Sequence, residues 1–314
     1  MPFKTSLGHT IFKQKYALNS HETWEGRVSM VMDWVCGNMS GTKNNLMAKS
    51  DRDELTQYMS EFKFIPGGRY LWYGGRDARF FNNCYLLRLE EDSREEWSGL
   101  SHRAMSCLMT GGGIGVDVSL CRPSGRALRS TGGVASGPLP LLETLNEIGR
   151  NVMQGGSRRS ALYGSMNWQH EDVKKLLVSK NWHDMEIKGA YNKDGTPMTI
   201  SDAKREDFNY KAPLDMMNIS LNYDDDWLNG NGSEIFRENC RQALTTGEPG
   251  FSFNFGEKKN ETLRNACTEI TSEDDSDVCN LGSINLANIE TIEELKDVVN
   301  LASKFLVCGL IRAH

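Results

Sequence analysis

The sequence predicts an α/β fold, and two changes of pattern along the chain are the reason. Apolar residues recur every three or four positions between residues 21 and 62, which is the period of an amphipathic helix. After residue 63, short apolar segments alternate with amphipathic stretches, and glycine-rich turns separate them. Such alternation favours a sheet with interleaved helices over separate helical and strand regions. We therefore divide the chain into a helical N-terminal region, residues 1–62, and an α/β region, residues 63–314.

In the helical region, Trp24, Val28, Met32 and Val35 mark one apolar face, and a second helix is expected at 51–62. Farther along, Thr291 and Glu294 stand in the register of a capping box at the start of a helix. The other expected helices cover 97–109, a segment opened by Pro138 and Pro140, 170–180, 233–244 and 292–306. The expected strands lie at 84–89, 116–121, 217–221 and 251–255, and the polar segment 184–214 is expected to be an irregular surface excursion.

The composition is that of a globular protein with room for a large core. Of 314 residues, 39% are hydrophobic and 25% are charged, and the net charge is −6. An acidic chain is poorly suited to neutralise the phosphates of duplex DNA, so we expect no direct nucleic-acid partner. No stretch is long and apolar enough for a membrane span, and the N-terminus lacks the apolar core of a signal peptide. These features predict a cytoplasmic protein, in the host cytoplasm if a phage encodes it.

Cysteine spacing limits the kinds of site that the chain can hold. No two cysteines form a CxxC pair, so a structural zinc site of the usual spacing is not expected, and we predict no metal site. Most of the cysteines are expected to be small buried hydrophobes. The eight are Cys36, Cys84, Cys107, Cys121, Cys240, Cys267, Cys279 and Cys308.

Two short motifs place cysteines beside polar groups. In NACTEI (265–270), which precedes CNLGSINL (279–286), an extended backbone would direct Asn265, Cys267 and Glu269 to one side. An amide, a thiol and a carboxylate would then share one surface. The alternative is a buried cysteine next to a surface glutamate, and the pattern alone leaves both open. In NNCYLL (82–87), Cys84 stands at the start of an expected strand, where a core cysteine is the simpler interpretation.

Two loops combine glycine with arginine. They cover residues 111–133 and 154–161, and they contain Arg122, Arg126, Arg158 and Arg159. Glycines allow backbone N–H groups to approach a phosphate closely, and arginine adds charge-assisted hydrogen bonds. Neither loop has the P-loop or the dinucleotide-binding pattern. Anion binding and plain solvated loops therefore both remain open.

Taken together, these segments resemble the ribonucleotide reductase family. The pair NACTEI…CNLGSINL resembles the family's finger-loop signature, and NNCYL resembles its first redox-cysteine motif. Four further segments resemble barrel segments of the family and occur in the same order: GGGIGVDVS, STGGVASGPLPLLETLNEIGR, MQGGSRRSALYGSMNWQHEDV and GEPGFSF. The resemblance covers residues 20–308. Because many segments occur in the same order, together they are stronger evidence for the family than any single motif.

The resemblance implies a fold and an activity. The fold would be the family's ten-stranded α/β barrel, built from two antiparallel sets of five parallel strands. This chain would supply the first half, a finger loop at about 256–286 and the start of the second half. The activity would be reduction of a ribonucleoside di- or triphosphate to the 2′-deoxyribonucleotide by thiyl-radical chemistry, which supplies deoxynucleotides for DNA replication.

The resemblance also implies catalytic roles. Cys267 would become the thiyl radical that abstracts the 3′ hydrogen of the ribose, and Glu269 would be the general base for the 3′ hydroxyl. Asn265 would hydrogen-bond the substrate hydroxyls. Cys84 and Cys279 would form the dithiol that is oxidised to a disulfide, which a thioredoxin-like reductant would reduce again by exchange.

Binding residues follow by the same resemblance. The substrate would contact Asn83, Gly112, Gly113 and Leu281. An allosteric dNTP or ATP would bind Asp92 and Ser93 with the first specificity loop, which contains Arg122 and Arg129. The second specificity loop would contribute Gln154, Arg158 and Arg159.

The radical source and the extent of the chain are further expectations. The N-terminus around Thr23 and the GGSRRSA loop resemble most the adenosylcobalamin-dependent class, with the large subunit of the di-iron class as the alternative. The glycyl-radical class fits less well, because its members generally lack the base that Glu269 would provide.

The sequence also departs from the family. Ala266 and Thr268 stand where the family has proline and glycine. The resemblance stops after Cys308, which predicts one half of a split gene that is inactive without a partner polypeptide carrying the rest of the barrel. An inactive nucleotide-binding fragment is the non-catalytic alternative, and a homodimer is left open.

Overall fold

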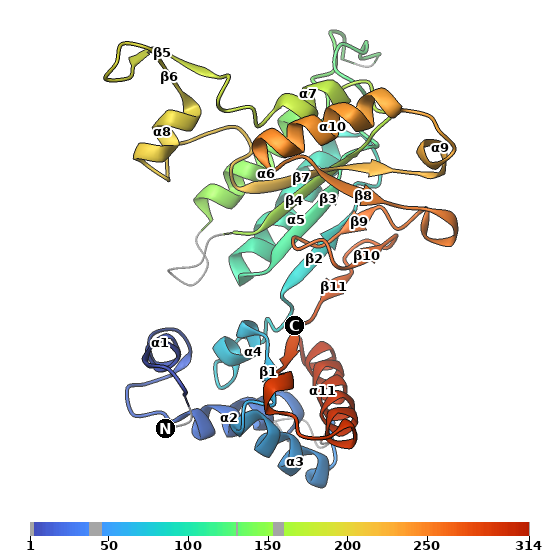
Figure 1. Ribbon diagram of the computed structural model, residues 1–314. Helices are drawn as coiled ribbons and strands as arrows, with labels where there is room; N and C mark the ends of the chain where they lie inside the picture. The colour runs from blue at the N-terminus through green and yellow to red at the C-terminus, as the bar shows by residue number, and fades with distance from the viewer. Residues whose placement is uncertain (1–2, 38–45, 130, 153–159, 314) are drawn as a thin grey trace. The chain divides into compact units, whose positions relative to one another are not determined.

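The computed structural model describes residues 3–37, 46–129, 131–152 and 160–313. The chain forms two units, one made of residues 1–83 with 278–314 and the other of residues 84–277 (Figure 1). The first unit is therefore assembled from both ends of the chain. The domain boundary proposed from the sequence, between residues 62 and 63, remains a prediction.

The first unit is mainly helical. Its longer helices are α2 (Trp24–Cys36), α3 (Lys49–Ser60) and α11 (Ile292–Arg312), and α2 contacts both of the others. Short elements complete it: α1 (Ser6–Ile11), the π-helical turn η1 (Phe12–Tyr16), β1 (Phe64–Pro66), α4 (Gly68–Tyr73), β11 (Val278–Cys279), β12 (Gly282–Ile284) and η3 (Leu286–Asn288). Strand β1 pairs antiparallel with β12.

Side-chain caps define where α2 and α11 begin, and the sequence predicted the one at Thr291. Thr23 accepts a hydrogen bond from the N–H of Gly26 at 3.1 Å, and α2 starts at the next residue. Thr291 accepts one from the N–H of Glu294 at 3.1 Å, and the Glu294 carboxylate accepts from the N–H of Glu290. The predicted apolar face of α2 is buried, since Val28 and Val35 are fully inaccessible.

The second unit contains five parallel strands in the order β2-β3-β4-β7-β8. They are β2 (Cys84–Leu87), β3 (Gly113–Asp117), β4 (Leu162–Asn167), β7 (Met217–Tyr223) and β8 (Gly250–Phe253). Helices α5 (Arg94–Thr110), α6 (Leu139–Asn151), α7 (Val173–Val178), α9 (Asp225–Leu228) and α10 (Ser233–Thr246) connect them. The α/β prediction is confirmed, although β3 begins three residues earlier than expected from the sequence.

The two faces of this sheet differ in polarity. Alternate strand residues such as Ile114, Val116 and Leu221 join the core that the helices cover (Figure 1). The residues between them point to the opposite face, because side chains alternate along a strand. That face carries Gly113, Gly115, Asp117, Tyr163, Ser165, Ser220, Asn222 and Ser252.

A hairpin covers the polar face. It consists of β9 (Leu263–Arg264) and β10 (Thr271–Ser272), which pair antiparallel. A side chain on Gly115 would place its Cβ only 1.7 Å from the carbonyl oxygen of Arg264. The hairpin can therefore lie directly on β3 only because position 115 is glycine. A short 3-10 helix, η2 (Gly256–Lys258), precedes the hairpin.

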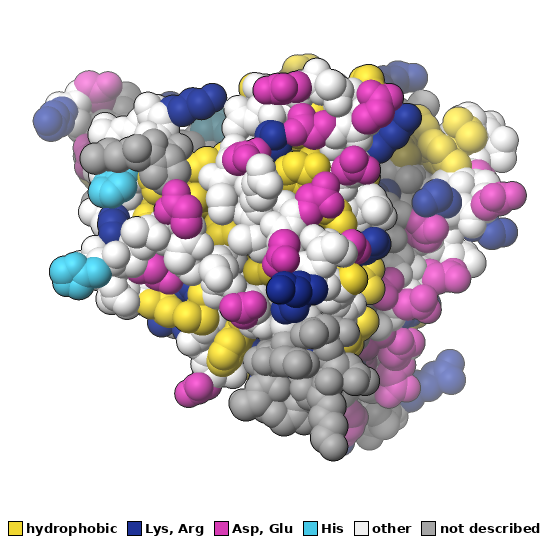
Figure 2. Space-filling model, turned by 90° about the horizontal axis from the view of Figure 1, so that it is seen from below, with side chains coloured by type: hydrophobic (Ala, Val, Ile, Leu, Met, Phe, Trp, Pro, Cys, Tyr) yellow, Lys and Arg dark blue, Asp and Glu magenta, His cyan; other side chains and the backbone are white. Residues whose placement is uncertain are grey.

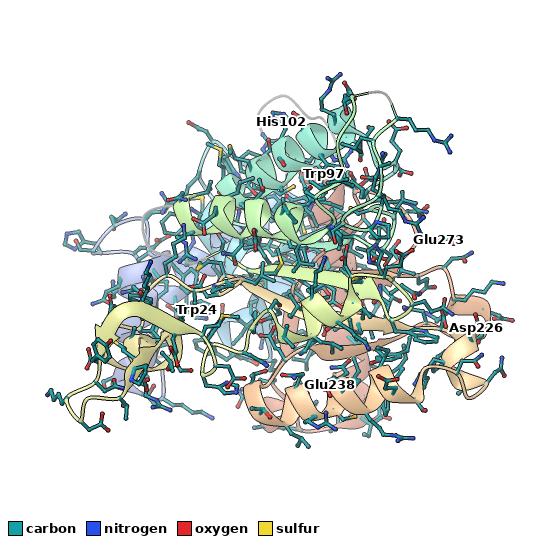
Figure 3. The ribbon with its side chains drawn as sticks, turned by 90° about the horizontal axis from the view of Figure 1, so that it is seen from above. Trp24, Trp97, His102, Asp226, Glu238 and Glu273 are labelled. Atoms are coloured by element: carbon teal, nitrogen blue, oxygen red, sulfur yellow. The ribbon has the colours of Figure 1, made fainter. Side chains whose placement is uncertain are left out.

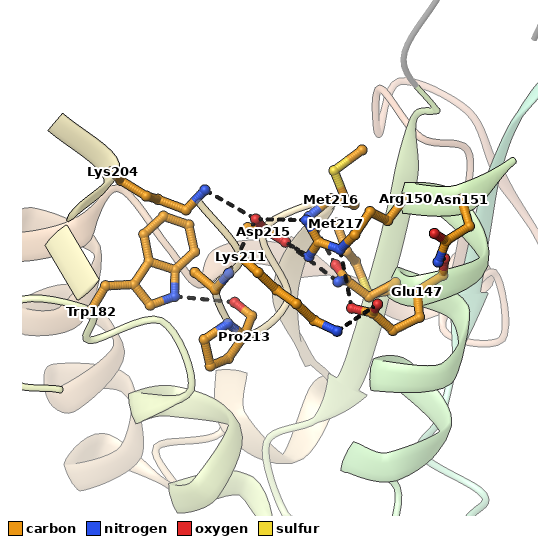
Figure 4. Close-up of polar contacts among 12 residues, drawn as sticks. Glu147, Arg150, Asn151, Trp182, Lys204, Lys211, Pro213, Asp215, Met216 and Met217 are labelled. Atoms are coloured by element: carbon orange, nitrogen blue, oxygen red, sulfur yellow. Dashed lines mark hydrogen bonds and ion pairs between the residues drawn. The ribbon is translucent and has the colours of Figure 1, made fainter. Parts of the chain in front are cut away.

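The polar excursion at 184–214 is more ordered than the sequence suggested. It contains the hairpin β5 (Glu186–Tyr191) and β6 (Pro197–Thr199), and then α8 (Ile200–Glu206). The turn at Asp194–Gly195 was not recognised because apolar alternation is weak on both sides of it. An ion-pair network fastens the base of the excursion to the end of α6 (Figure 4), where Asp215 accepts from Arg150 and, at 3.0 Å, from Lys204.

Charges of both signs are mixed on the surface. On the face seen in Figure 2, acidic side chains are interspersed with Lys and Arg. Within the described ranges, no helix is both long and apolar enough to cross a membrane.

Substituting Gly115 by Ala should destabilise the second unit strongly. The new methyl group would overlap the backbone of Arg264, which cannot rotate away as a side chain could, so we expect a loss of about 3 kcal/mol in the free energy of unfolding. Urea unfolding followed by circular dichroism measures this. The control is Gly99→Ala on α5, where the nearest atom lies 3.9 Å from the new Cβ and about 0.5–1 kcal/mol should be gained. Equal stability of the two variants would contradict the close packing of the hairpin.

Candidate active site

The tip of the β9–β10 hairpin is a turn and not the extended segment expected from the sequence. The N–H of Thr268 donates to the carbonyl of Asn265 at 3.0 Å, which closes the turn. The N–H of Ile270 donates to the Asn265 side-chain oxygen at 3.1 Å. As a result Asn265 is fully buried, whereas Cys267 and Glu269 are exposed. Neither interpretation that the sequence left open is met: the turn folds Asn265 inward, so the three side chains do not share one surface, and Cys267 is not buried.

Thr268 explains why the alternation fails. Its φ is 71°, in the left-handed region that β-branched residues rarely adopt. This conformation costs roughly 1–2 kcal/mol relative to the right-handed one. The resemblance places glycine here, and glycine would adopt the same turn without that cost. The turn geometry is thus retained in this chain despite the substitution.

Arg264 holds the base of the hairpin, a role that no local sequence pattern indicates. Its guanidinium donates to the side-chain oxygen of Asn254 at 3.0 Å, to the carbonyl of Phe253 at 3.2 Å and to the hydroxyl of Ser252. Strand β8 is inverted relative to the usual pattern, since Ser252 is 2% exposed while Phe253 is 45% exposed. The alternation in FSFNF correctly indicates a strand, but the polar side chains of this segment are the buried ones.

Strand register places Cys84 close to the hairpin tip within the second unit. Cys84 is 5% exposed and is the cross-strand partner of Gly113. A Cβ built on Gly113 would lie 2.9 Å from the Cβ of Ala266. Cys84 therefore neighbours the glycine on which the residue before Cys267 packs. Gly112 precedes β3, and its N–H donates to the carbonyl of Cys107 at 3.3 Å.

The other predicted redox and substrate residues gather in the first unit. Cys279 is 2% exposed, and its carbonyl accepts from the N–H of Asn83 at 2.8 Å. The carbonyl of Leu281 accepts from the N–H of Gly67 at 2.8 Å. A Cβ on Gly67 would lie 2.9 Å from both Leu281 O and Asn83 Oδ1. These four residues thus form one cluster.

Two amides in these clusters have buried polar atoms to offer a ligand. The Asn265 side-chain nitrogen and the Asn83 side-chain oxygen are both inaccessible and have no hydrogen-bond partner among the described residues. A buried polar group without a partner costs about 1–3 kcal/mol, so a ligand that supplied one would bind favourably. The Asn265 nitrogen is a donor and the Asn83 oxygen is an acceptor, so each by itself could bind a hydroxyl group.

Asp117, at the end of β3, was not recognised from the sequence. Burial raises the pKa of its carboxyl group, although hydrogen bonds from Ser119 and Thr262 act in the opposite direction. The Ser119 N–H donates to it at 3.0 Å. The carboxyl lies on the polar face that the hairpin covers, and its burial depends on contacts that only the folded chain creates.

The structure brings together part of the predicted effector site. Asp92 accepts from the N–H of Arg122 at 2.9 Å and from the guanidinium of the same residue. Its other oxygen accepts from the indole of Trp97 at 3.1 Å. Figure 3 labels Trp97 on α5. Ser93 caps α5 by accepting from the N–H of Glu96 at 3.1 Å. Arg129 is exposed farther along the same loop. Gln154, Arg158 and Arg159 lie outside the described residues.

Asp172 fastens the loop that follows Arg122. Its carboxylate accepts from the Ser124 N–H at 2.7 Å, from the Ser124 hydroxyl at 2.6 Å and from Lys175 at 2.7 Å. Burial alone would raise the pKa of Asp172, but these hydrogen bonds outweigh it and lower the pKa to about 2. The loop therefore has a fixed anchor on the helical side of the sheet.

No metal centre is visible in the part of the chain that the structure describes, since no three His, Cys, Asp or Glu side chains are grouped to hold an ion there.

Replacing Asp117 by Asn should stabilise the protein at neutral pH. A carboxyl group whose pKa is raised in the folded state weakens folding once the pH exceeds its unfolded pKa of about 3.9, and the neutral amide avoids this cost. We expect a gain on the order of 1 kcal/mol at pH 7 that shrinks to nothing near pH 3. Urea midpoints at several pH values measure it. The exposed carboxylate of Asp274 gives the control variant Asp274→Asn, for which no such pH-dependent gain is expected. A loss of stability in Asp117→Asn at pH 7 would contradict the burial argument.

Comparison with known proteins identifies the family of the chain. Residues 82–310 match the family described as ribonucleotide reductase, barrel domain. A vitamin B12-dependent ribonucleoside-diphosphate reductase of Thermoplasma acidophilum is 26% identical, over 81% of this chain and 34% of its own length. A putative adenosylcobalamin-dependent ribonucleoside-triphosphate reductase of Mycobacterium phage D29 is 23% identical, over 98% of this chain and 59% of its own length. The alpha subunit of a ribonucleoside-diphosphate reductase of Chlamydia muridarum is 25% identical, over 79% of this chain and 27% of its own length.

The chain thus spans between about a quarter and three fifths of the length of these relatives. The family match covers most of the chain and includes all five parallel strands, the β9–β10 hairpin and nearly all of α11. The chain belongs to the ribonucleotide reductase family.

Proposed function

We propose that this chain carries the radical-bearing finger loop and first half-barrel of an enzyme that reduces ribonucleotides to 2′-deoxyribonucleotides. The observation that carries the proposal is the hairpin tip, which presents the Cys267 thiol and the Glu269 carboxylate to solvent while its base packs on the glycines of β3. A thiol that must react with a substrate needs this combination of exposure at the tip and rigidity at the base.

Each residue then has a defined task. Cys267, as a thiyl radical, removes the 3′ hydrogen, and Glu269 accepts the proton of the 3′ hydroxyl. The Asn265 side-chain nitrogen offers a hydrogen bond to a substrate hydroxyl, and Asn83, Gly112, Gly113 and Leu281 contact the rest of the substrate. The 2′ hydroxyl leaves as water. Cys84 and Cys279 supply two electrons and become a disulfide, which a thioredoxin-like dithiol reduces.

For the radical source we propose adenosylcobalamin, the cofactor class named for the relatives from Thermoplasma acidophilum and phage D29. The exposed side chain of Cys267 fits this assignment, because a bound cofactor must reach the thiol from outside the hairpin. When bound, the cofactor would supply the radical that activates the thiol. The alternative is the large subunit of the di-iron class, and the Chlamydia muridarum relative is named as an alpha subunit.

We further propose that a dNTP or ATP binds at Asp92, Ser93 and the loop with Arg122 and Arg129, with Gln154, Arg158 and Arg159 contributing from the second loop. Arg122 is already fixed by Asp92, and its side chain is 46% exposed, so one side of the guanidinium can meet a phosphate. Occupation of this site would alter substrate preference at the other, which is a coupling between two sites.

The relatives contain further sequence that this chain does not match, and the proposed activity requires it. We propose that a further polypeptide supplies this sequence and completes the barrel. The reaction would take place in the cytoplasm, that of the host if a phage encodes the chain, and a homodimer is one assembly to examine. A chain that only binds nucleotides is the competing non-catalytic function.

The direct test is reduction of CDP and CTP with adenosylcobalamin and a small dithiol. The chain is assayed alone and mixed with the product of the downstream reading frame, and deoxynucleotides are measured by chromatography. We expect activity in the mixture and its complete loss in Cys267→Ala. Cys121→Ala, which removes a buried thiol on the helical side of the sheet, is the control and should keep the activity of a folded protein. If the mixture that contains Cys267→Ala produced deoxynucleotides as fast as the mixture that contains the unchanged chain, the assignment of Cys267 as the radical residue would be contradicted.

Effector binding can be tested on this chain by itself. Removing the guanidinium in Arg122→Ala takes away one charge-assisted hydrogen bond of about 1.5–3 kcal/mol, so binding of a dNTP should weaken at least tenfold. Isothermal calorimetry measures the affinity. Arg205→Ala is the matched control, because Arg205 is an exposed arginine paired with an aspartate in the excursion. Similar affinity in both variants would place the nucleotide elsewhere.

A further inference from the structure

Two cysteines outside the proposed site lie against each other in the core of the first unit. Cys36 is the last residue of α2 and Cys308 belongs to the final turns of α11, and the two helices are in contact. Cys36 is fully buried and Cys308 is 3% exposed. Their thiols are hydrogen-bonded to each other.

The hydrogen bond between them distinguishes the two thiols. It lowers the pKa of Cys308, while the guanidinium of Arg312, one helical turn farther along α11, acts to lower the pKa of both thiols. The same hydrogen bond, together with burial, raises the pKa of Cys36. Arg312 is 4% exposed and donates to the carbonyl of Gly37 at 2.7 Å, so its charge is held at the end of α2. Cys308 is therefore the better nucleophile and Cys36 the proton donor.

The pair is also connected to the strand that carries Cys279. A Cβ on Gly309 would lie 1.9 Å from the hydroxyl of Tyr70, so the ring packs on the backbone next to Cys308. Tyr70 donates to the side-chain oxygen of Asn280 at 2.5 Å, and Asn280 donates to the carbonyl of Leu306 at 2.9 Å. Tyr70 thus connects the backbone next to Cys308 to Asn280, the residue that follows Cys279.

We propose that Cys36 and Cys308 form a second redox-active dithiol, which a peroxide converts into a disulfide that joins α2 to α11. This site goes beyond the proposed function and does not depend on it. The buried guanidinium of Arg312 keeps a positive charge beside the pair, which favours the thiolate form that reacts with an oxidant. A peroxide suits the site because it is small and uncharged enough to reach buried thiols.

The chemistry balances in two steps. The Cys308 thiolate attacks one peroxide oxygen, the S–O bond forms, the O–O bond breaks and the leaving hydroxide takes up a proton to become water. The sulfur of Cys36 then attacks the sulfur of Cys308, the S–S bond forms, the S–O bond breaks and a second water leaves. In total, two thiols lose two electrons and two protons and hydrogen peroxide becomes two waters. A dithiol reductant reverses the change by exchange.

The test uses the full chain, reduced and then treated with hydrogen peroxide. Its tryptic peptides are mapped by mass spectrometry without reduction, and the exposed thiol of Cys267 reports that the oxidant has acted. We expect the Cys36 and Cys308 peptides to appear as one linked species, about 2 Da lighter than their sum. Oxidation of Cys267 while the other two peptides stay separate and reduced would overturn the proposal.

Single substitutions test which sulfur reacts first. In Cys36→Ser, dimedone should trap a sulfenic acid on Cys308, whereas in Cys308→Ser position 36 should stay unmodified. Trapping on Cys36 instead would overturn the assignment of Cys308 as nucleophile. Cys121→Ser, which changes a cysteine 2% exposed in the second unit, is the control and should keep the Cys36–Cys308 link. If a variant does not fold, the peptide map of the unchanged chain still decides the proposal.

Discussion

The second unit depends on the close approach of the β9–β10 hairpin to strand β3. A backbone carbonyl occupies the space that a side chain on Gly115 would fill, and Ala266 packs on Gly113 in the same way. This contact explains why a sheet with one apolar and one polar face can be stable. The polar face is closed by a hairpin whose own arginine, Arg264, donates to the side chains of Ser252 in β8 and of Asn254 just after it. Shifting the hairpin by one residue would leave Arg264 buried without these partners, so the register of the tip is fixed by its base.

Rigidity at the base and exposure at the tip follow from the same arrangement. Asn265 turns inward and holds the loop through its own side chain, while Cys267 and Glu269 remain accessible. The left-handed Thr268 shows that the turn is maintained by the surrounding contacts, since a threonine does not favour it locally. A reactive thiol placed this way needs little further ordering when a substrate arrives, which lowers the entropic cost of reaction.

Much of the architecture was predictable because it is encoded locally. Apolar periodicity predicted α2 and α11, a threonine cap supported the start of α11, and short apolar runs between turns predicted parallel strands. The features that were missed depend on long-range contacts. The inverted burial of β8, the role of Arg264 and the buried carboxyl of Asp117 all arise because the hairpin covers the polar face, and no local pattern carries that information. The direction of Asn265 was wrong for a related reason, because a left-handed residue three positions later converts a strand-like segment into a turn.

The first unit consists of residues from both ends of the chain, and this affects the order in which the protein folds. During synthesis, α2 and α3 leave the ribosome long before α11, which supplies Val298, Leu301 and Phe305 to their shared core. The central segment 84–277 is complete earlier and has mostly sequential strand neighbours, so it can reach its structure first. Contacts between residues so distant in sequence form slowly because a long loop must close. The N-terminal helices therefore pass through a stage with exposed apolar surface, and a chaperone that binds nascent chains would find its target there.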